Sequence, residues 1–424
     1  MVDPAAREVR PHQDVGVTGA TLAAIGPTGT VGTPSRVLDG RGRLLLPGLV
    51  NCHTHLPMGV FRGTSELRPL QSWLNWVERI QAECDEEDFY WGALLSLCQM
   101  LHAGITTVAD MYAPAAVGAA AVERSGIRGF LSESLAGGTE TGRRGSLEVQ
   151  LARAEDLARR WHGAEGGRIE TGMAPHSVYA CDESLLREVA QTAHRMGVGM
   201  HVHVAETAVE VERCQADFGR RPPRVLADCG VFDGRAVAAH CVHLHEDDVA
   251  LLAEFGVGVA HNPASNLKLR SGVAPLPALR AAGVSVGLGT DSAGSNDRLD
   301  LWRDCYLAAV LHEWGDQVSC AWEALEMATA AGAAALRMGD RVGRLAPGFR
   351  ADLILLDATK PHLAPLLDPP RALVYAARGD EVKTVMVDGR VVVEEGRLLT
   401  VEEDQVVEQC RRRATRLFAG GVPA

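Results

Sequence analysis

The chain has 424 residues, enough for one large domain with a smaller companion or for about two to three domains of average size. Its formal net charge of −12 argues against nucleic acid or an anionic membrane as a main partner. No stretch of about eighteen residues is uninterruptedly apolar, and residues 1–14 contain no apolar segment typical of a secretory signal. Ten scattered cysteines without a CxxC pair fit reduced thiols, so we expect a cytoplasmic protein.

Eight short apolar runs end in polar residues, and helix-like amphipathic segments separate most of them. The runs are 44–55, 104–112, 127–134, 168–177, 197–206, 235–244, 255–265 and 283–297. The first begins with Leu44–Val50, which we interpret as one buried strand. Eightfold alternation of strand and helix predicts an α/β fold with a (β/α)8 barrel. A doubly wound sheet also fits the alternation, but it would spread the strand ends along a crevice.

The two ends of the chain differ from this pattern. Residues 15–45 and about 342–398 are rich in short strand patterns with hairpin signals such as "DG" and "EEG". We therefore expect residues 1–48 and 342–424 to build one small β-sandwich domain plus a terminal helix over about 400–418. Residues 49–341 are expected to form a metal-dependent catalytic barrel.

A His-x-His pair ends the first apolar run, in "NCHTHLPM" at residues 51–58. Side chains alternate along a strand, so His53 and His55 point to the same side and can bind one metal ion. A second pair, His201 and His203, ends the fifth run, and Glu206 follows three residues after His203. His201 lacks such a carboxylate and is interpreted as a packed or supporting residue.

Corresponding strand ends therefore carry a set of nitrogen and carboxylate donors. The first, fifth, sixth and eighth runs offer His53, His55, His203, His240 and Asp291. Catalytic Zn²⁺ and similar divalent ions take these donors. Any one of them could be a packed or capped side chain, but five at equivalent strand ends indicate a metal site.

The same segments resemble a known family. "PGLVNCHTHLPM", "HVHVAET", "AHCVHL", "HNPASNLKLRSGVAPLPAL" and "GLGTDSAGSND" resemble the amidohydrolase superfamily, especially its S-adenosylhomocysteine/5′-methylthioadenosine deaminase and chlorohydrolase-like branch. "GRLAPGFRADLILLD" and "VKTVMVDGRVVVEEGRLLT" resemble that family's C-terminal β-domain. The resemblance covers the chain from about Asp14 to Phe418.

The resemblance implies a role for each residue that matches a motif. The implied metal ligands are His53, His55, His203 and Asp291, and the implied catalytic residues are Glu206, His240 and Asp291. Glu206 matches the acid/base, His240 lies beside the metal-bound water, and Asp291 can accept that water's proton. His176 matches a residue near the sugar of a bound nucleoside.

One divalent ion per subunit is expected, with Zn first and Fe or Mn as alternatives. Binuclear relatives bridge two metals with a carbamylated lysine on a middle strand, and no lysine precedes Lys268 here. A glutamate, for which Glu133 is the candidate, is the remaining way to build such a bridge.

Several further residues are candidates for the substrate pocket. Trp73 and Glu83 lie in the segment that forms the substrate lid in the resembling family. That family's adenosine-type deaminases place an arginine near the position of Gln150, so Arg143 and Arg144 are alternatives for the substrate's tail. Ser292 stands where the family often has glycine.

Other polar residues at strand ends have mainly structural interpretations. Asp110 is expected to orient neighbouring backbone or a ligand histidine. His261 and Asn262 either shape the pocket or tie the seventh strand to the following helix.

The resemblance implies a hydrolytic deaminase of an aminated purine or related N-heterocycle, which releases ammonia through attack of a metal-bound hydroxide. Adenosine, S-adenosylhomocysteine and 5′-methylthioadenosine are the first candidates. The alternatives are 8-oxoguanine, pterin or triazine rings, and hydrolytic dechlorination. A catalytically silent relative is the alternative from another class, but all six metal-binding and acid/base residues are present. A small-molecule substrate and a homo-oligomer of two or four subunits are the expected partners.

Overall fold

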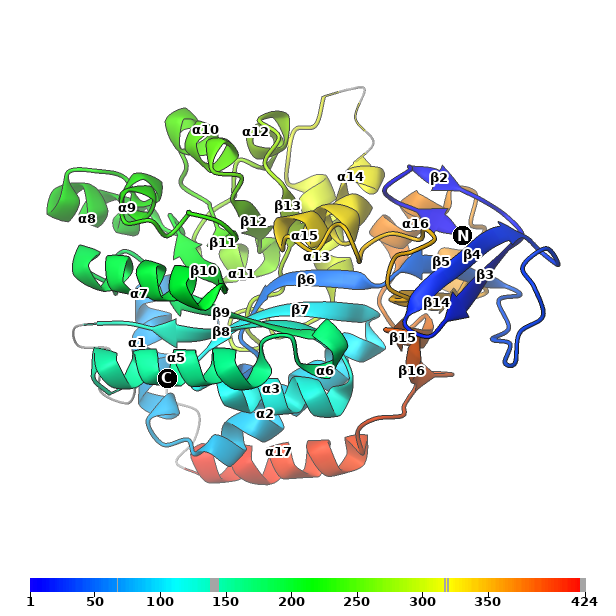
Figure 1. Ribbon diagram of the computed structural model, residues 1–424, viewed down its shortest axis with the longest axis horizontal. Coiled ribbons are helices and arrows are strands. Elements are labelled where there is room, and N and C mark those ends of the chain that lie inside the picture. Colours follow the sequence, from blue (N-terminus) through cyan, green and yellow to red (C-terminus); the bar gives the residue numbers. More distant parts are fainter. Residues whose placement is uncertain (67, 138–144, 316–317, 319, 420–424) are drawn as a thin grey trace.

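A closed sheet of eight parallel strands forms the centre of the computed structural model, which describes residues 1–66, 68–137, 145–315, 318 and 320–419 (Figure 1). The strands neighbour one another in chain order: β6 Leu49–Thr54, β7 Ile105–Tyr112, β8 Arg128–Leu135, β9 Ile169–Pro175, β10 Gly199–Val204, β11 Ala236–His240, β12 Gly258–His261 and β13 Val286–Leu288. A parallel bridge between Thr54 and Asp291 joins the last strand's end to the first. This closure confirms the (β/α)8 barrel and excludes the doubly wound sheet.

Helices surround the barrel, as expected for parallel strands that are buried on both faces (Figure 1). They include η1 Leu56–Phe61, α1 Leu70–Gln81, α2 Glu86–His102, α3 Ala115–Ser125, α5 Leu147–Trp161, α6 Ala164–Gly167, α7 Glu183–Met196, α8 Ala208–Phe218, α9 Pro222–Asp228, α10 Glu246–Glu254, α11 Pro263–Lys268, α12 Leu276–Ala281, α13 Leu301–Val310, α14 Cys320–Met327 and α15 Ala330–Ala335. Local capping fixes several ends: Asp182 accepts from the Leu185 amide at the start of α7, and Gly197 ends that helix with φ +67°.

Both ends of the chain contribute to an antiparallel β-domain beside the barrel (Figure 1). One sheet has the order β17 Arg397–Leu398, β16 Arg390–Glu394, β15 Val382–Val387, β14 Leu353–Asp357 and β5 Arg43–Pro47. The hairpin of β3 Gln13–Thr18 and β4 Thr21–Pro27 packs on it through a cluster that contains Leu22, Leu353 and Met386. A short pair, β1 Val2–Asp3 and β2 Glu8–Val9, stands apart from both sheets.

The remaining elements connect this domain to the barrel. α16 Pro369–Ala376 follows η3 Pro361–Leu363 and contacts α13 and α14. The terminal helix α17 Glu403–Leu417 lies beside α2, where Arg413 Nη1 is 3.0 Å from Asp88 Oδ1 (Figure 1). Among the described residues, no helix combines the length and apolar character needed to cross a membrane.

The prediction that Leu44–Val50 is one strand is wrong. Its first part belongs to β5, which pairs with β14, and its last residues begin β6 of the barrel. The chain changes sheets at Gly48, whose amide donates to Asp352 O at 3.0 Å. A side chain at position 48 would lie 2.1 Å from Thr106 Oγ1, so only glycine fits this crossing.

A buried ionic cluster joins the base of the barrel to the β-domain. Arg128, at the start of β8, places Nε 2.9 Å from Asp352 Oδ2 and Nη2 2.5 Å from Asp388 Oδ1. The Arg128 and Asp352 side chains are almost fully buried. Breaking such a cluster leaves an uncompensated buried charge, so it fixes the two domains to each other.

Candidate functional site

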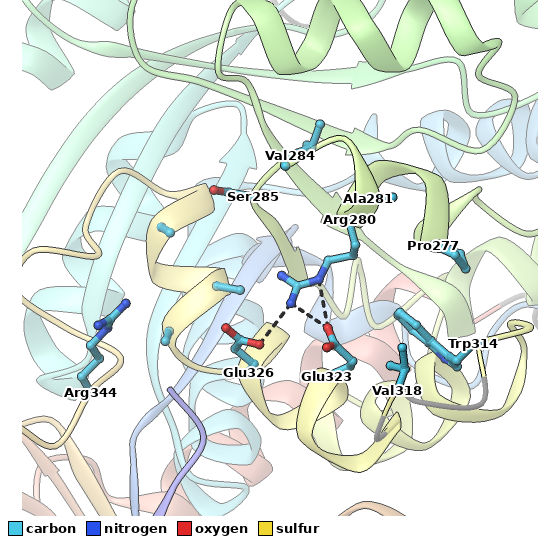
Figure 2. Close-up of a pocket in the computed structure, with 15 residues that line it drawn as sticks. Pro277, Arg280, Ala281, Val284, Ser285, Trp314, Val318, Glu323, Glu326 and Arg344 are labelled. Carbon is cyan, nitrogen blue, oxygen red and sulfur yellow. Dashed lines mark hydrogen bonds and ion pairs between the residues drawn. The ribbon is translucent and has the colours of Figure 1, made fainter. Parts of the chain in front are cut away.

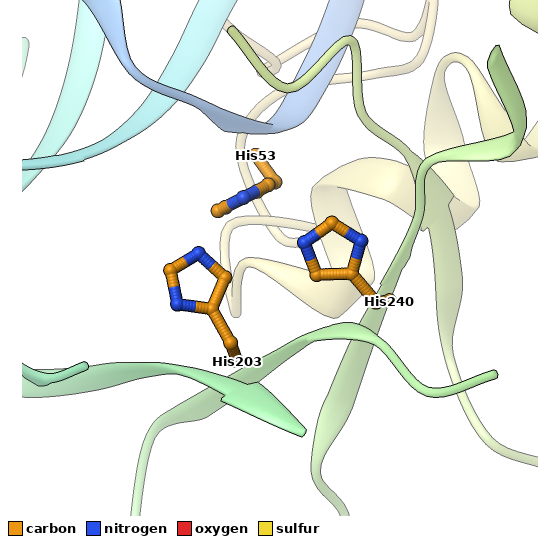
Figure 3. Close-up of side chains that lie close together, drawn as sticks. All are labelled: His53, His203 and His240. Carbon is orange, nitrogen blue, oxygen red and sulfur yellow. The ribbon is translucent and has the colours of Figure 1, made fainter. Parts of the chain in front are cut away.

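Four histidines and one aspartate meet at the carboxyl-terminal ends of the barrel strands. His53 lies in β6, one residue before its end, His203 lies in β10, and His240 ends β11. His55 and Asp291 follow β6 and β13. The centroid of the His53 ring lies 4.8 Å from that of His55, 5.1 Å from that of His203 and 5.3 Å from that of His240. Figure 3 shows the rings of His53, His203 and His240 facing one common space from three sides.

Hydrogen bonds fix the orientation of three of these rings. His203 Nδ1 donates to His176 O at 2.8 Å, and His55 Nδ1 donates to Met111 O. His53 Nδ1 lies 3.0 Å from His201 Nε2, which gives His201 the supporting role expected from the sequence. Each ring therefore turns Nε2 toward the others, and the buried Nε2 of His53 has no hydrogen-bond partner among the described residues.

Asp291 faces this cluster with one oxygen. Its Oδ1 lies 3.3 Å from His55 Nε2 and 3.7 Å from His53 Nε2. Burial would raise the pKa of Asp291, but His55, His240 and the hydroxyls of Ser265 and Ser295 outweigh burial and lower it. The carboxyl is therefore ionised at neutral pH.

This donor set fits one divalent cation. One ligand atom from each of His53, His203 and His240 lies within 4.8 Å of the others, and the same holds for His53, His55 and Asp291. Burial, reinforced by neighbouring histidines, holds the pKa values of His53 and His203 well below the usual value, so both rings are neutral, as ligands must be. The unpartnered Nε2 of His53 is the atom that such an ion would satisfy.

Glu133, the alternative bridging residue, is engaged elsewhere. Its Oε2 accepts from the Ala115 amide at 2.7 Å, and its Oε1 lies 3.1 Å from Arg153 Nε on α5. Asp110, as expected, orients backbone, because its Oδ1 accepts from the Leu56 amide at 2.6 Å.

Glu206 stands beside the histidines, two residues after β10. Its Oε1 accepts from Ser271 Oγ at 3.1 Å, and its Oε2 lies 3.8 Å from His240 Nε2. Burial raises the pKa of Glu206, and Asp291 adds to the shift. For His240, burial alone would lower the pKa, but the nearby Glu206 and Asp291 carboxylates raise it. Both shifts favour the protonated form, so Glu206 and His240 are suited to hold or pass a proton.

The backbone that carries these groups is unusual. Ala205, His240 and Asp291 have φ values of +47°, +71° and +55°. Non-glycine residues rarely adopt this conformation, and they persist in it only when surrounding contacts hold them. Glu210 provides such contacts by accepting from the amides of Ala205 at 3.1 Å and Glu206 at 2.7 Å.

Three of the predicted substrate residues lie at this end of the barrel. His176 follows β9, and its ring centroid is 4.6 Å from that of His203. Ser292 is buried and donates its amide hydrogen to Asp291 Oδ1 at 2.7 Å. Trp73, on α1, is buried, and its Cζ2 would lie 3.3 Å from a methyl group added at Gly294.

The structure does not bring Glu83 or Gln150 into the site. Glu83 is exposed beyond the end of α1. Gln150 is fully buried, and its amide bonds to Ala136 N, Ala136 O and Gly145 O, which leaves no group for a substrate. Arg143 and Arg144 lie outside the described residues.

Gln81 is a residue of this region that the sequence analysis missed. Its Nε2 donates to Tyr112 Oη at 2.8 Å, and the Tyr112 ring centroid is 6.4 Å from that of His55. No local pattern signals this contact, because it joins a helix end to a strand end 31 residues away.

A separate hollow of about 540 Å³ lies between α12, α14 and α15 (Figure 2). Arg280 crosses it and pairs with Glu323 at 2.6 Å and Glu326 at 3.1 Å. Ser285, on its wall, precedes β13, so the hollow opens at the amino-terminal ends of the strands. None of the predicted site residues line it, and TIM-barrel chemistry occurs at the opposite face.

The chain is similar to known proteins over nearly its whole length. The model of the amidohydrolase family matches residues 44–392. A 5-methylthioadenosine/S-adenosylhomocysteine deaminase of Pelotomaculum thermopropionicum is 42% identical over 411 residues, which cover 95% of this chain and 94% of that protein. One of Desulforudis audaxviator is 43% identical over 412 residues, which cover 96% and 95%.

Solved structures with the same fold include the following two. An adenosine deaminase from Xanthomonas campestris with bound zinc superposes with a TM-score of 0.93 and 32% identity, over 98% of this chain and 96% of that one. An atrazine chlorohydrolase from Arthrobacter aurescens complexed with zinc gives a TM-score of 0.86 and 27% identity, over 97% and 95%.

Proposed function

This chain belongs to the amidohydrolase family, and we propose that it is a metal-dependent hydrolytic deaminase of an adenosine-type nucleoside. Adenosine, S-adenosylhomocysteine and 5′-methylthioadenosine are the proposed substrates. The two deaminases named above, at 42% and 43% identity, and the zinc-bound adenosine deaminase support this class.

The observation that carries the proposal is the convergence of ionised and neutral metal donors beside a buried carboxyl, Glu206. The proposed ligands of one ion are His53, His55, His203 and Asp291. Zinc is the proposed metal, supported by the zinc in two structural relatives, with iron or manganese as alternatives. When bound, such an ion supplies Lewis acidity and makes hydroxide available at neutral pH.

The chain's own residues would then move the protons. Asp291 Oδ1, the oxygen that faces the histidines, accepts a proton from the attacking water. Glu206, whose pKa is raised by burial, donates a proton from Oε2 to the ring nitrogen next to the attacked carbon. His240 Nε2 faces the same space and hydrogen-bonds the adduct. As the new C–O bond becomes a carbonyl, the hydroxyl of the adduct returns a proton to Glu206, and the ring nitrogen keeps the proton that Glu206 gave it. The C–N bond breaks, and the amino group takes the proton held on Asp291 and leaves as ammonia.

Trp73, His176 and Ser292 are the proposed contacts to the substrate. The Trp73 ring offers an apolar surface against which a flat heterocycle can pack. His176 is half-buried next to the ligand His203, where a sugar attached to the ring would lie.

A different ring or leaving group is the alternative. The atrazine chlorohydrolase shares the fold at a TM-score of 0.86, so the barrel and its histidines do not by themselves select the substrate. Triazine, 8-oxoguanine and pterin substrates therefore belong in the test.

Ammonia release from the purified, zinc-loaded chain tests the proposal. The panel contains adenosine, S-adenosylhomocysteine, 5′-methylthioadenosine, guanine, 8-oxoguanine, cytosine, a pterin and atrazine. Release from an adenosine-type compound is expected, and Glu206→Gln should lower kcat by about 100- to 10,000-fold. Glu212→Gln, which removes an exposed carboxyl of the neighbouring helix, is the matched control and should leave kcat unchanged. Activity only on another ring would refute the nucleoside assignment, and full activity in Glu206→Gln would refute the role of that carboxyl.

The proposed setting is the cytoplasm, which the ten free cysteines support. The homo-oligomer of two or four subunits stays a prediction, and light scattering during gel filtration measures it directly.

A further inference from the structure

The short helix α11 contacts two proton-handling residues that come from different strands. Ser265 Oγ donates to Asp291 Oδ2 at 2.5 Å, and Asn266 Oδ1 lies 2.7 Å from His240 Nδ1. Ser265 and Asn266 are adjacent in the chain and both buried. One helix thus reaches Asp291 after β13 and His240 at the end of β11.

The contact with Ser265 decides which oxygen of Asp291 faces the histidines. Oδ2 accepts two hydroxyl hydrogens, from Ser265 at 2.5 Å and from Ser295 at 2.9 Å. Two donors occupy the lone pairs of that oxygen. Oδ1 accepts only the Ser292 amide hydrogen, at 2.7 Å, and keeps a lone pair toward His55 Nε2 at 3.3 Å.

The contact with Asn266 decides which nitrogen of His240 carries hydrogen. A carbonyl oxygen only accepts, so His240 Nδ1 donates to Asn266 Oδ1. Asn262 Nδ2 lies 3.3 Å from the same Nδ1, but a nitrogen that carries hydrogen cannot accept from it. In the neutral ring, His240 Nε2, 3.8 Å from Glu206 Oε2, is then the nitrogen with a lone pair directed into the site.

Contacts at both ends hold α11 itself in place. The buried Asp304 of α13 accepts from the Ala264 amide at 3.2 Å, near the start of the helix. At its end, Lys268 Nζ donates to Gly294 O at 3.1 Å and forms an ion pair with Asp297. Gly294 and Asp297 belong to the loop that begins at Asp291, so α11 and this loop are fixed to each other.

We propose that α11 is the positioning element of the site: Ser265 directs Oδ1 of Asp291 toward the histidines, and Asn266 fixes the tautomer of His240. This inference rests on the proposed function, in which Asp291 and His240 act in the same hydrolytic reaction. Neither Ser265 nor Asn266 touches the reacting atoms, so both act through a neighbour.

The test compares Ser265→Ala, which removes the hydroxyl, with Ser265→Thr, which keeps it. Ser265→Ala should lower kcat about 10- to 100-fold with KM within about twofold, because orientation and not substrate contact is lost. It should also lower the zinc affinity about tenfold in competition with a chelator. Ser265→Thr should restore both quantities to near the wild-type values. Ser125→Ala, which removes a buried hydroxyl within α3, is the matched control and should change neither.

Asn266 provides a second, independent pair of variants. Asn266→Ala should lower kcat at unchanged KM, and Asn266→Asp, which keeps an acceptor at His240 Nδ1, should recover most of it. The positioning role would be overturned if Ser265→Ala kept the wild-type kcat and zinc affinity. It would also be overturned if Ser265→Thr and Asn266→Asp both folded but failed to restore function. The zinc measurement stands even if no compound of the panel releases ammonia, so failure of the proposed function and failure of this inference are distinguishable.

Discussion

Glu210 is a buried carboxyl of α8 that holds the backbone leading to Glu206, and its replacement by glutamine tests this arrangement. Its oxygens accept from the amides of Ala205 and Glu206. Burial, reinforced by the neighbouring Glu206 carboxyl, raises the pKa of Glu210 from 4.5 to about 8. The folded chain therefore keeps a proton on Glu210 at pH values at which the unfolded chain has lost it.

The sign of the pH dependence follows from this difference in bound protons. Below about pH 4.5 both states carry the proton, and Glu210 causes no pH-dependent loss of stability. Between pH 4.5 and about 8 the free energy of unfolding falls with rising pH, at about 1.4 kcal/mol per pH unit. The loss over the whole window is on the order of 5 kcal/mol.

Glu210→Gln should therefore flatten the stability profile. Glutamine has no proton to lose, but its NH2 group cannot accept one of the two backbone hydrogens. The variant should be about 1–3 kcal/mol less stable than the wild type near pH 5 and should become the more stable protein toward pH 9.

Urea unfolding of the zinc-loaded proteins, followed by circular dichroism from pH 5 to 9, measures this crossover. Glu212→Gln, an exposed neighbour on the same helix, is the control and should follow the wild type at every pH. A stability difference between Glu210→Gln and wild type that stays constant with pH would show that Glu210 is ionised in the folded chain, contrary to the argument.

Three further predictions concern the domain contact, the pocket and the metal. Arg128→Met should lower the free energy of unfolding by about 3–5 kcal/mol, because the buried carboxylate of Asp352 loses its cationic partner and stays beside Asp388. An unchanged urea midpoint would contradict this. Gln81→Ala should raise KM about fivefold with little change in kcat, because Tyr112 loses the hydrogen bond that holds it near His55. Steady-state kinetics test this, and a fall in kcat alone would argue against a role of Gln81 in the pocket. Chelation of the metal should abolish ammonia release and lower the melting temperature, and added zinc should restore both; activity that survives chelation would remove the metal from the mechanism.

The sequence predicts the barrel and the donor set because both depend on local pattern. Each barrel strand lies in an apolar run with a polar residue near or just beyond its carboxyl end, and the ends of parallel strands must meet at one face. This geometry brings His53, His203, His240 and Asp291 together from residues that are up to 238 positions apart in the printed sequence. Spacing along a strand also predicts that His55 shares a side with His53.

The contacts that the sequence does not predict depend on tertiary geometry. The crossing at Gly48 is set by the nearby Thr106 side chain, which no local pattern reveals. Glu83 lies in the segment that resembles the family's substrate lid, yet α1 ends at Gln81, and it is Gln81 that reaches Tyr112. Helix ends depend on packing as much as on sequence, so the residue of this segment that reaches the site region could not be predicted from the sequence.

His240 and Asp291 have a left-handed backbone conformation, which the contacts that stabilise the barrel must hold in place. Glycine would adopt φ values near +55° without strain, but glycine cannot supply the carboxylate of Asp291 or the imidazole of His240. Each such residue costs about 1–2 kcal/mol, so the surrounding structure must hold it. At Asp291 the amide donates to His53 O at 3.0 Å, and Asp291 O accepts from Thr54 Oγ1 at 3.0 Å. The bonds that close the barrel between its first and last strands therefore also hold Asp291 in the strained conformation that turns its carboxylate toward the histidines.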